Sequence, residues 1–165
     1  MVKFCYLDNK EKEHWLPLLF DILYDNMRTI APSKKSYDEE KGKWLLEVSP
    51  ALDKAPRRII LAFSEDELVG YVQYYTCNDL LMIEEIQIIK KYQRTRLFYQ
   101  MCKNLEQILP DDIEYVEAYA DKRNVNSQLI MKNCEMQEIE GNMDSPFVHF
   151  RGSVQSIKNK KLSRN

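Results

Sequence analysis

The segment from residue 80 to residue 120 constrains the fold more than any other part of the sequence. Residues 80–89 and 115–120 are β-rich runs, and residues 94–109 between them carry apolar side chains on one helical face before Pro110. A strand, a helix and a strand in this order predict a crossover unit whose two strands run parallel. Open α/β sheets bind ligands at the carboxyl ends of such strands. We therefore expect a ligand crevice between these two strands.

The rest of the chain predicts helices and strands around this unit. Ser36, with Glu39 three residues later, forms a capping-box pattern that opens a helix toward Val48. The runs "RIILAF" and "LVGYVQYYT" flank the polar "SEDE" and predict an antiparallel hairpin. The remaining segments are strand 2–7, helix 11–26, a loop or fraying end at 49–58, helix 124–133, and closing strands at 136–139 and 147–151.

The predicted fold class is mixed α/β (α+β). Its centre is a twisted, mostly antiparallel sheet of about seven strands with one parallel, splayed pair, flanked by about four helices. With 165 residues, one domain over residues 1–152 suffices. Residues 153–165 contain four basic and no acidic residues, and we expect this tail to be mobile.

Composition argues against several classes of partner. The formal net charge is −2, so nothing global favours a nucleic-acid or membrane partner. Asp21 interrupts the longest apolar stretch, and we expect neither a signal peptide nor a spanning helix. The four cysteines are far apart and lack metal spacing, so we expect reduced thiols, no bound metal and a cytoplasmic location.

The segments "LVGYVQYY", "IEEIQIIKKYQRTRLFYQMCKNL" and "NVNSQLIMKNCEMQEI" resemble three motifs of one family, the GNAT superfamily of acyl-CoA-dependent N-acyltransferases. "LVGYVQYY" is similar to the family's third strand, "vvGfi". "IEEIQIIKKYQRTRLFYQMCKNL" is similar to "ie.l.V.peyrgkGiGs.Ll", and "NVNSQLIMKNCEMQEI" to "N..a..lYeklGF..v". The resemblance covers residues 1–151. It implies a GNAT-like fold, acetyl-CoA as cosubstrate and a small-molecule or peptide amine as acceptor. The acceptor and the oligomeric state, a homodimer included, stay open.

The resemblance places the cofactor at the end of the first crossover strand. Main-chain groups of Ile86 and Ile88 would hold the pantetheine arm and the thioester, and Ile88 lies near the strand bulge that the family uses. The family's pyrophosphate cradle, Q/R-x-x-G-x-G/A, corresponds to the segment that begins at Gln93, but Arg96 and Phe98 replace its glycines. The residues implied in cofactor binding here are Gln93, Arg94, Thr95, Arg96, Leu97, Phe98 and Tyr99.

Side chains at the glycine positions leave three alternatives for this turn. Helix N-terminal amides and the helix dipole attract phosphate whatever the side chain, but side chains crowd the ligand. The turn is an ordinary cradle, a cradle altered by compensating arginines, or a solvated basic turn without cofactor.

Two further positions of the resemblance lie in the last motif. Met131 occupies the place of the family's tyrosine acid and cannot donate a proton. Asn124 matches and would contact the pantetheine arm, or it caps the helix that follows, and the two roles are compatible. The family's "GF" falls on Glu135 and Met136, so the turn there differs in sequence.

Glu84 and Glu117 are the candidate catalytic bases. Glu84 and Glu85 should point to opposite faces of their strand, with Glu84 on the face of Ile86 and Ile88, because side chains alternate along a strand. Glu117 should likewise share a face with Tyr119 on the second crossover strand. Both carboxylates also fit solvated positions on a strand face.

Two functions therefore remain. The first is an acetyl-CoA-dependent N-acetyltransferase that acts on a primary amine. The alternative is a catalytically impaired GNAT-fold module for ligand binding or protein interaction, favoured by the departures at Arg96, Phe98 and Met131.

The two histidines, His14 and His149, belong to no metal-spaced cluster and fit structural or exposed positions. An apolar stripe on the first helix predicts either core packing or an acceptor wall: Trp15, Phe20, Tyr24 and Met27.

Overall fold

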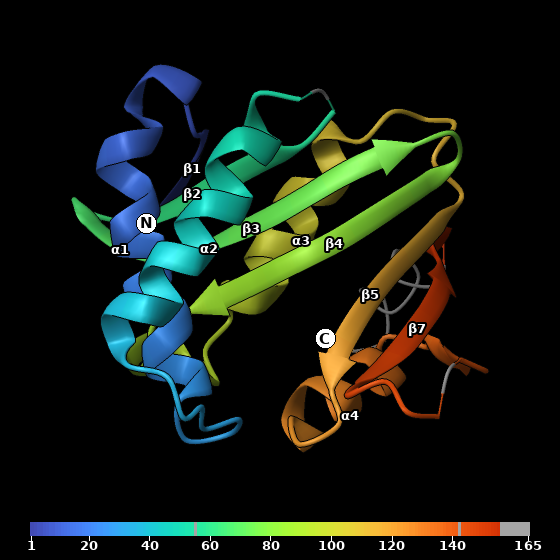
Figure 1. The fold of residues 1–165 in the computed structure, drawn as a ribbon. Coiled ribbons are helices and arrows are strands. Elements are labelled where there is room, and N and C mark those ends of the chain that lie inside the picture. Colours follow the sequence, from blue (N-terminus) through green and yellow to red (C-terminus); the bar gives the residue numbers. More distant parts are fainter. Residues whose placement is uncertain (55, 142, 156–165) are drawn as a thin grey trace.

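The centre of the protein is one seven-stranded mixed sheet, as predicted (Figure 1). The computed structural model describes residues 1–54, 56–141 and 143–155. The strands lie in the order β1-β2-β3-β4-β5-β7-β6. Their bounds are Val2–Tyr6 (β1), Arg58–Ser64 (β2), Glu67–Cys77 (β3), Leu80–Ile88 (β4), Tyr115–Asp121 (β5), Gln137–Ile139 (β6) and Phe147–Ser153 (β7).

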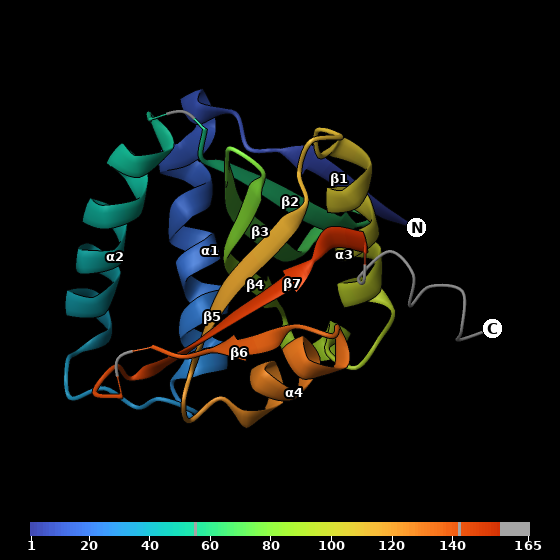
Figure 2. The ribbon, with the colours of Figure 1, turned by 90° about the vertical axis from the view of Figure 1, so that its right-hand side faces the viewer.

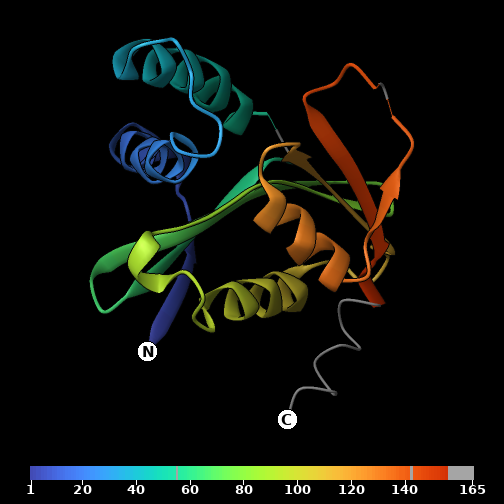
Figure 3. The same ribbon diagram turned by 90° about the horizontal axis from the view of Figure 1, so that it is seen from below.

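Helices cover both faces of the sheet. The described helices are α1 (Lys12–Met27), α2 (Tyr37–Leu52), α3 (Leu97–Ile108) and α4 (Val125–Asn133). Figures 2 and 3 show α1 and α2 on one face and α3 and α4 on the other. We call these the α1/α2 face and the α3/α4 face. Each carries its own apolar core, with Leu16 and Tyr71 buried on the first and Met101 and Phe150 on the second.

The predicted crossover is confirmed, and its two strands soon separate. β4 and β5 pair in parallel only from Leu80 opposite Tyr115 to Ile83 opposite Ala118. β4 continues to Ile88 alongside β3, and β5 continues to Asp121 alongside β7. The two strands therefore diverge toward their carboxyl ends and leave a gap in the sheet, as Figure 1 shows.

Two helix boundaries differ from the prediction. The capping box of α2 is present, because Ser36 and Glu39 exchange hydrogen bonds, but the helix runs on to Leu52 and includes Pro50. The helix predicted to begin at residue 94 begins at Leu97 instead. Arg94 has a φ of 62°, in the left-handed region, which no residue of a right-handed helix adopts.

The ordered C-terminal part extends slightly beyond residue 152. Ser153 ends β7, and the buried Val154 packs into the α3/α4-face core. Residues 156–165 of the predicted mobile tail lie outside the described residues.

Gly70 brings β3 close to the strand that borders the gap. It lies opposite Ile88, and a Cβ atom at Gly70 would lie 2.5 Å from the carbonyl oxygen of Gln87. This contact is with the main chain, so a side-chain rotation could not relieve it. Glycine is therefore required here for close approach of two strands.

We predict that Gly70→Ala destabilises the protein by about 2 kcal/mol or more, because β3 and β4 must move apart. Urea unfolding at equilibrium measures this change. Gly42→Ala is the matched control: Gly42 lies inside α2 with no atom within 4 Å of an added Cβ, so alanine should stabilise the helix by up to about 1 kcal/mol. A Gly70 variant as stable as the wild type would contradict the close approach.

Candidate active site

The free edge of β4 forms one wall of the gap. The amide of Ile89 donates to the carbonyl oxygen of Val69 at 3.0 Å, so that pair faces β3. Because hydrogen-bonding direction alternates along a strand, Ile86 and Ile88 turn their main-chain groups away from β3 and toward the gap. The carbonyl oxygen of Ile88 accepts hydrogen bonds from Gln93 Nε2 and Asn26 Nδ2, each at 3.0 Å. The edge at Ile86 thus faces the gap where β5 no longer pairs.

Gln93 and Thr95 brace the turn between β4 and α3 from within. Gln93 Nε2 bonds to Asn26 Oδ1 at 2.9 Å in addition to Ile88. Thr95 Oγ1 donates to the carbonyl oxygen of Tyr92 at 2.6 Å and accepts from the Leu97 amide at 3.2 Å. These side chains hold the turn in shape.

The turn leaves main-chain donors and positive charge exposed. Arg96 is the N-cap of α3, so the amides of Phe98 and Tyr99 have no intrahelical acceptor. Arg94 and Arg96 are exposed beside them. Phe98, in contrast, is partly buried and packs against the α3/α4-face core. The predicted cradle therefore has two free amides and two guanidinium groups at one helix terminus.

The last motif keeps its backbone shape although its residues differ. Asn124 caps α4, since its Oδ1 accepts from the Ser127 amide at 3.1 Å, so its predicted capping role is confirmed. Met131 is partly buried against the core. Glu135 has a φ of 60°, a conformation that usually needs glycine, at the position of the glycine in the family motif.

The expectation that Glu84 and Glu85 point to opposite faces is wrong. Gln73 pairs with Glu85 and Tyr74 with Ile83, so Glu84 is the extra residue of a β-bulge. A bulge suspends the alternation of side chains. Both carboxylates consequently lie on the α1/α2 face, where they line a hollow of about 270 Å³. The bulge also lies at Glu84 and not near Ile88, where the resemblance had placed it.

Glu84 is neutralised by a fixed cation. Arg57 donates to both of its oxygens, and Gln73 Nε2 donates to Oε2 at 2.9 Å. The Arg57 guanidinium also lies over the Tyr75 ring, 5.2 Å from its centroid. Both oxygens of Glu84 are therefore already occupied by hydrogen-bond donors of the protein.

Glu85 is the carboxylate in this hollow that titrates near neutral pH. Burial, with a smaller contribution from the charge of Glu84, raises its pKa to about 7, although a hydrogen bond from Gln87 opposes the shift. That bond joins Gln87 Nε2 and Glu85 Oε2 at 2.8 Å. The buried Gln73 also lines the hollow, and its Oε1 has no partner among the described residues. The hollow thus offers acceptor atoms to a ligand that donates hydrogen bonds.

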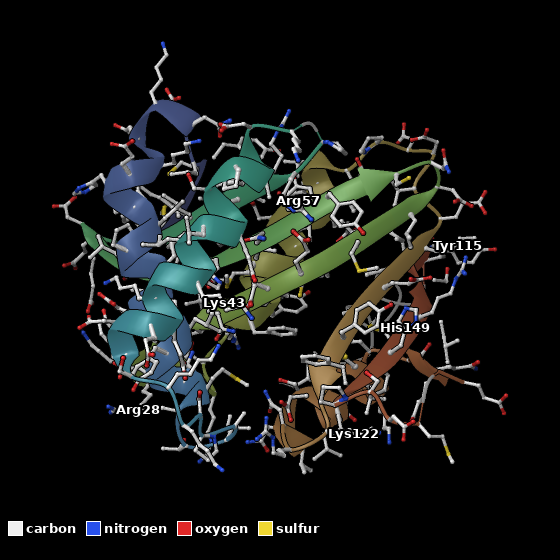
Figure 4. All side chains as sticks on the ribbon, in the orientation of Figure 1. Arg28, Lys43, Arg57, Tyr115, Lys122 and His149 are labelled. Atoms are coloured by element: carbon white, nitrogen blue, oxygen red, sulfur yellow. The ribbon has the colours of Figure 1, made fainter. Side chains whose placement is uncertain are left out.

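Glu117 lies on β5, within the stretch that still pairs with β4, and is buried. As predicted, it shares the α1/α2 face with Tyr119. Glu117 Oε2 lies 2.8 Å from His149 Nε2, and its Oε1 lies 3.4 Å from Arg151 Nη1. The His149 ring stacks on Tyr119 with centroids 4.2 Å apart. Figure 4 shows His149 and Tyr115 on β7 and β5, away from α1 and α2.

A larger cavity of about 580 Å³ opens beside this hollow. Trp44 and Glu47 line both spaces, so they adjoin. Of the predicted apolar stripe, Phe20, Tyr24 and Met27 line the larger cavity. Trp15 does not line it and contacts Phe63, with ring centroids 5.4 Å apart. Helix α1 therefore contributes both to the core and to a cavity wall.

Sequence analysis missed two groups of this site. Glu85 was not among the candidate bases, because Glu84 was assigned to the face of Ile86 and Ile88, and His149 was treated as an isolated histidine. The doubled "EE" at the end of the parallel pairing was the one available signal for the bulge. Within the described residues, no His, Cys, Asp or Glu group could hold a metal ion, and no helix is long and apolar enough to cross a bilayer.

We predict that Glu85→Gln stabilises the protein at about pH 8 by as much as about 3 kcal/mol and has little effect at about pH 5. Between its ordinary pKa of 4.5 and about 7, Glu85 keeps its proton in the folded state and loses it when unfolded. The free energy of unfolding therefore falls as pH rises through this window, and glutamine removes that loss. Urea unfolding at the two pH values measures it, with the exposed Glu138→Gln as control. An unchanged pH dependence in Glu85→Gln would contradict the assignment.

Comparisons with known proteins agree with this architecture. The model of the Acetyltransferase (GNAT) family matches residues 16–134. An acetyltransferase from Thermus thermophilus shares 15% identity with a TM-score of 0.72, covering 93% of this chain and 97% of that one. The PaiA N-acetyltransferase from Thermoplasma acidophilum, solved with coenzyme A, shares 14% identity with a TM-score of 0.69, covering 93% and 99%.

A GNAT-family acetyltransferase from Staphylococcus aureus has the same fold, at 12% identity and a TM-score of 0.69, covering 93% and 99% of the two chains. No curated protein sequence matches the chain. The family model covers more than half of the sequence and contains the strands that border the gap, the turn at Gln93 and helix α4. The chain belongs to the GNAT family of acetyltransferases.

Proposed function

We propose that the protein transfers the acetyl group of acetyl-CoA to a primary amine. One observation supports the proposal: a basic helix terminus and a carboxylate-lined hollow both lie beside the gap between β4 and β5. A helix terminus with free amides and two arginines lies at the end of β4, and the carboxylate-lined hollow opens on the α1/α2 face at the point where β4 and β5 part. A donor and an acceptor bound there would meet across the free edge of β4.

In this arrangement the pyrophosphate of acetyl-CoA binds at the turn before α3. The amides of Phe98 and Tyr99 point at an anion there, and the helix dipole and the guanidinium groups of Arg94 and Arg96 add attraction. The pantetheine arm has amide groups that pair with the strand edge at Ile86. This pairing carries the thioester toward the bulge at Glu84. Of the three alternatives for the turn, the geometry favours the altered cradle.

The acceptor amine approaches from the α1/α2 face. Its ammonium group donates hydrogen bonds to Glu85 and to the unpaired Gln73 Oε1, and the body of the molecule extends toward the cavity beyond Trp44 and Glu47. The pKa of Glu85, about 7, leaves it charged under mildly basic conditions, where a cation binds best.

The reaction joins the amine nitrogen to the acetyl carbon and breaks the bond between that carbon and sulfur. The family's tyrosine acid is replaced by the partly buried Met131, which has no proton to give. A thiol pKa of about 8.5 makes the thiolate a tolerable leaving group without an acid. A positioned acid contributes roughly a hundredfold to ten-thousandfold, so its absence slows transfer without abolishing it.

The replacement at Met131 also supports a second candidate function. A GNAT-fold module that binds acetyl-CoA without transferring its acetyl group would keep the turn and the gap and would not need the acid. The two candidates differ in turnover and agree in cofactor binding, so binding and activity have to be measured separately.

We predict that Arg94→Glu weakens acetyl-CoA binding by about tenfold or more, because it replaces a cation by an anion at the pyrophosphate site. Isothermal titration calorimetry measures the Kd. Lys103→Glu is the control, since Lys103 is exposed on α3 away from its N-terminus. The wild-type Kd should also rise with salt, because exposed charges are screened over about 10 Å. Equal binding by both variants would exclude the turn as the cofactor site.

Release of coenzyme A thiol, measured with hexylamine, benzylamine, putrescine and glycinamide, then separates the two candidates. Acetylation of at least one amine, identified by mass spectrometry, is the expected result. Tight acetyl-CoA binding without any acetylated product would favour the binding module.

A further inference from the structure

We propose that His149, oriented by Glu117, is the group that takes a proton from the acceptor amine. The inference rests on the proposed function and adds to it a residue outside the three motifs that resemble the GNAT family. The structure supports it through a buried carboxylate–imidazole pair, a free ring nitrogen and the position of the pair beside the gap.

The pairing with Glu117 determines which nitrogen of His149 is free. Glu117 is only 9% exposed, and its Oε2 lies 2.8 Å from His149 Nε2. An ionised carboxylate only accepts hydrogen bonds, so Nε2 carries the proton of the neutral ring. The lone pair then lies on Nδ1, which has no hydrogen-bond partner among the described residues. His149 therefore presents a basic nitrogen that remains available to a ligand.

The surroundings of His149 hold the ring in place and leave it accessible. Tyr119 stacks on one ring face with an interplanar angle of 13°. Arg151 lies 3.4 Å from the second oxygen of Glu117, and Ile139 is the neighbour of His149 on β6. The His149 side chain keeps 22% of its surface exposed. An imidazolium formed here would be stabilised by the Glu117 carboxylate at the opposite nitrogen.

The register of three strands places Tyr119 of β5 at the start of the gap, with His149 beside it on β7, one strand further from β4. Ala118 is the last β5 residue that pairs with β4, and the next residue, Tyr119, is opposite His149 on β7. On the other side, Ile83 is the last paired residue of β4 and is followed by the bulge at Glu84. Figures 1 and 4 show that α1 and α2 do not extend over β5 and β7 on this face. Glu85 thus lies on the β4 side of the opening, and Glu117 with its partner His149 lies on the β5 and β7 side.

The proton transfer balances with the reaction. The acceptor ammonium gives one proton to His149 Nδ1, and the resulting neutral amine forms a bond to the carbonyl carbon of the thioester. The carbon–sulfur bond breaks, and the sulfur leaves with the bonding electrons. The nitrogen then gives its excess proton to the thiolate, which yields the amide and the coenzyme A thiol. His149 returns its proton to solvent.

This assignment separates the roles of the nearby carboxylates. Glu84 is held by Arg57, Glu85 binds the acceptor ammonium, and Glu117 is a positioning residue that acts through His149. Substitution of Glu85 should therefore act mainly on KM for the amine. Substitution of His149 should act mainly on kcat.

The test compares His149→Gln with His14→Gln, because these are the two histidines of the chain. His14 lies on α1 against Trp15, outside the hollow and the cavity. With whichever of hexylamine, benzylamine, putrescine and glycinamide the wild type acetylates fastest, His149→Gln should lower kcat by about a hundredfold or more. The KM for that amine and the Kd of acetyl-CoA should change less than about threefold, and His14→Gln should match the wild type.

Three further measurements separate a chemical role from a structural one. The kcat of the wild type should rise with pH, and this rise should disappear in His149→Gln. Glu117→Gln should keep the fold, by thermal unfolding, but lower kcat. Nitrogen-resolved NMR of the histidine rings should show the proton of neutral His149 on Nε2 in the wild type.

Three results would overturn the proposal. One is an unchanged kcat and pH profile in His149→Gln while the wild type turns over. Another is the opposite tautomer at His149. The third is loss of the pH dependence in Glu85→Gln but not in His149→Gln. Failure of the wild type to acetylate any of the amines would instead refute the proposed function, and this inference with it.

Discussion

The end of hydrogen bonding between β4 and β5 is the constraint on which the site depends. The two strands share only four residue pairs, after which each stays bonded to its other neighbour. The bulge at Glu84 follows immediately after the last pair on β4, and a bulge increases the local twist of its strand. Three features therefore arise at the same point of the chain. The strands diverge there, the edge of β4 at Ile86 becomes free, and the carboxylates of Glu84 and Glu85 come to lie on one face.

The carboxylates at this point stay compatible with the fold because each has a different environment. Arg57 neutralises Glu84, and burial with the nearby charge of Glu84 keeps the pKa of Glu85 near 7. Glu117 is stabilised by His149 and Arg151. Three acidic groups can thus lie near one opening without three uncompensated charges.

At the positions where the family motifs have glycine, this chain differs in its side chains more than in its backbone conformation. Glu135, at the glycine of the last motif, adopts a φ of 60°, the left-handed conformation that glycine adopts without strain, at a cost of about 1 kcal/mol or more. Arg96 and Phe98, at the two glycine positions of the predicted cradle, need no such conformation, because Arg96 has a φ of −74° and Phe98 lies within α3. The shape of the turn before α3 therefore does not require these glycines, and Arg96 adds positive charge where glycine would add none.

The sequence by itself determined the order of strands and helices, the parallel pair and the place of the basic turn before α3. These follow from local periodicity, from the capping pattern at Ser36 and from the geometry of a crossover, all of which act over short stretches. Only the tertiary structure decided the faces of Glu84 and Glu85, because the bulge arises from pairing with Gln73 on another strand. It also decided the partner of His149, since Glu117 lies 32 residues away and meets it only through the register of β5 and β7.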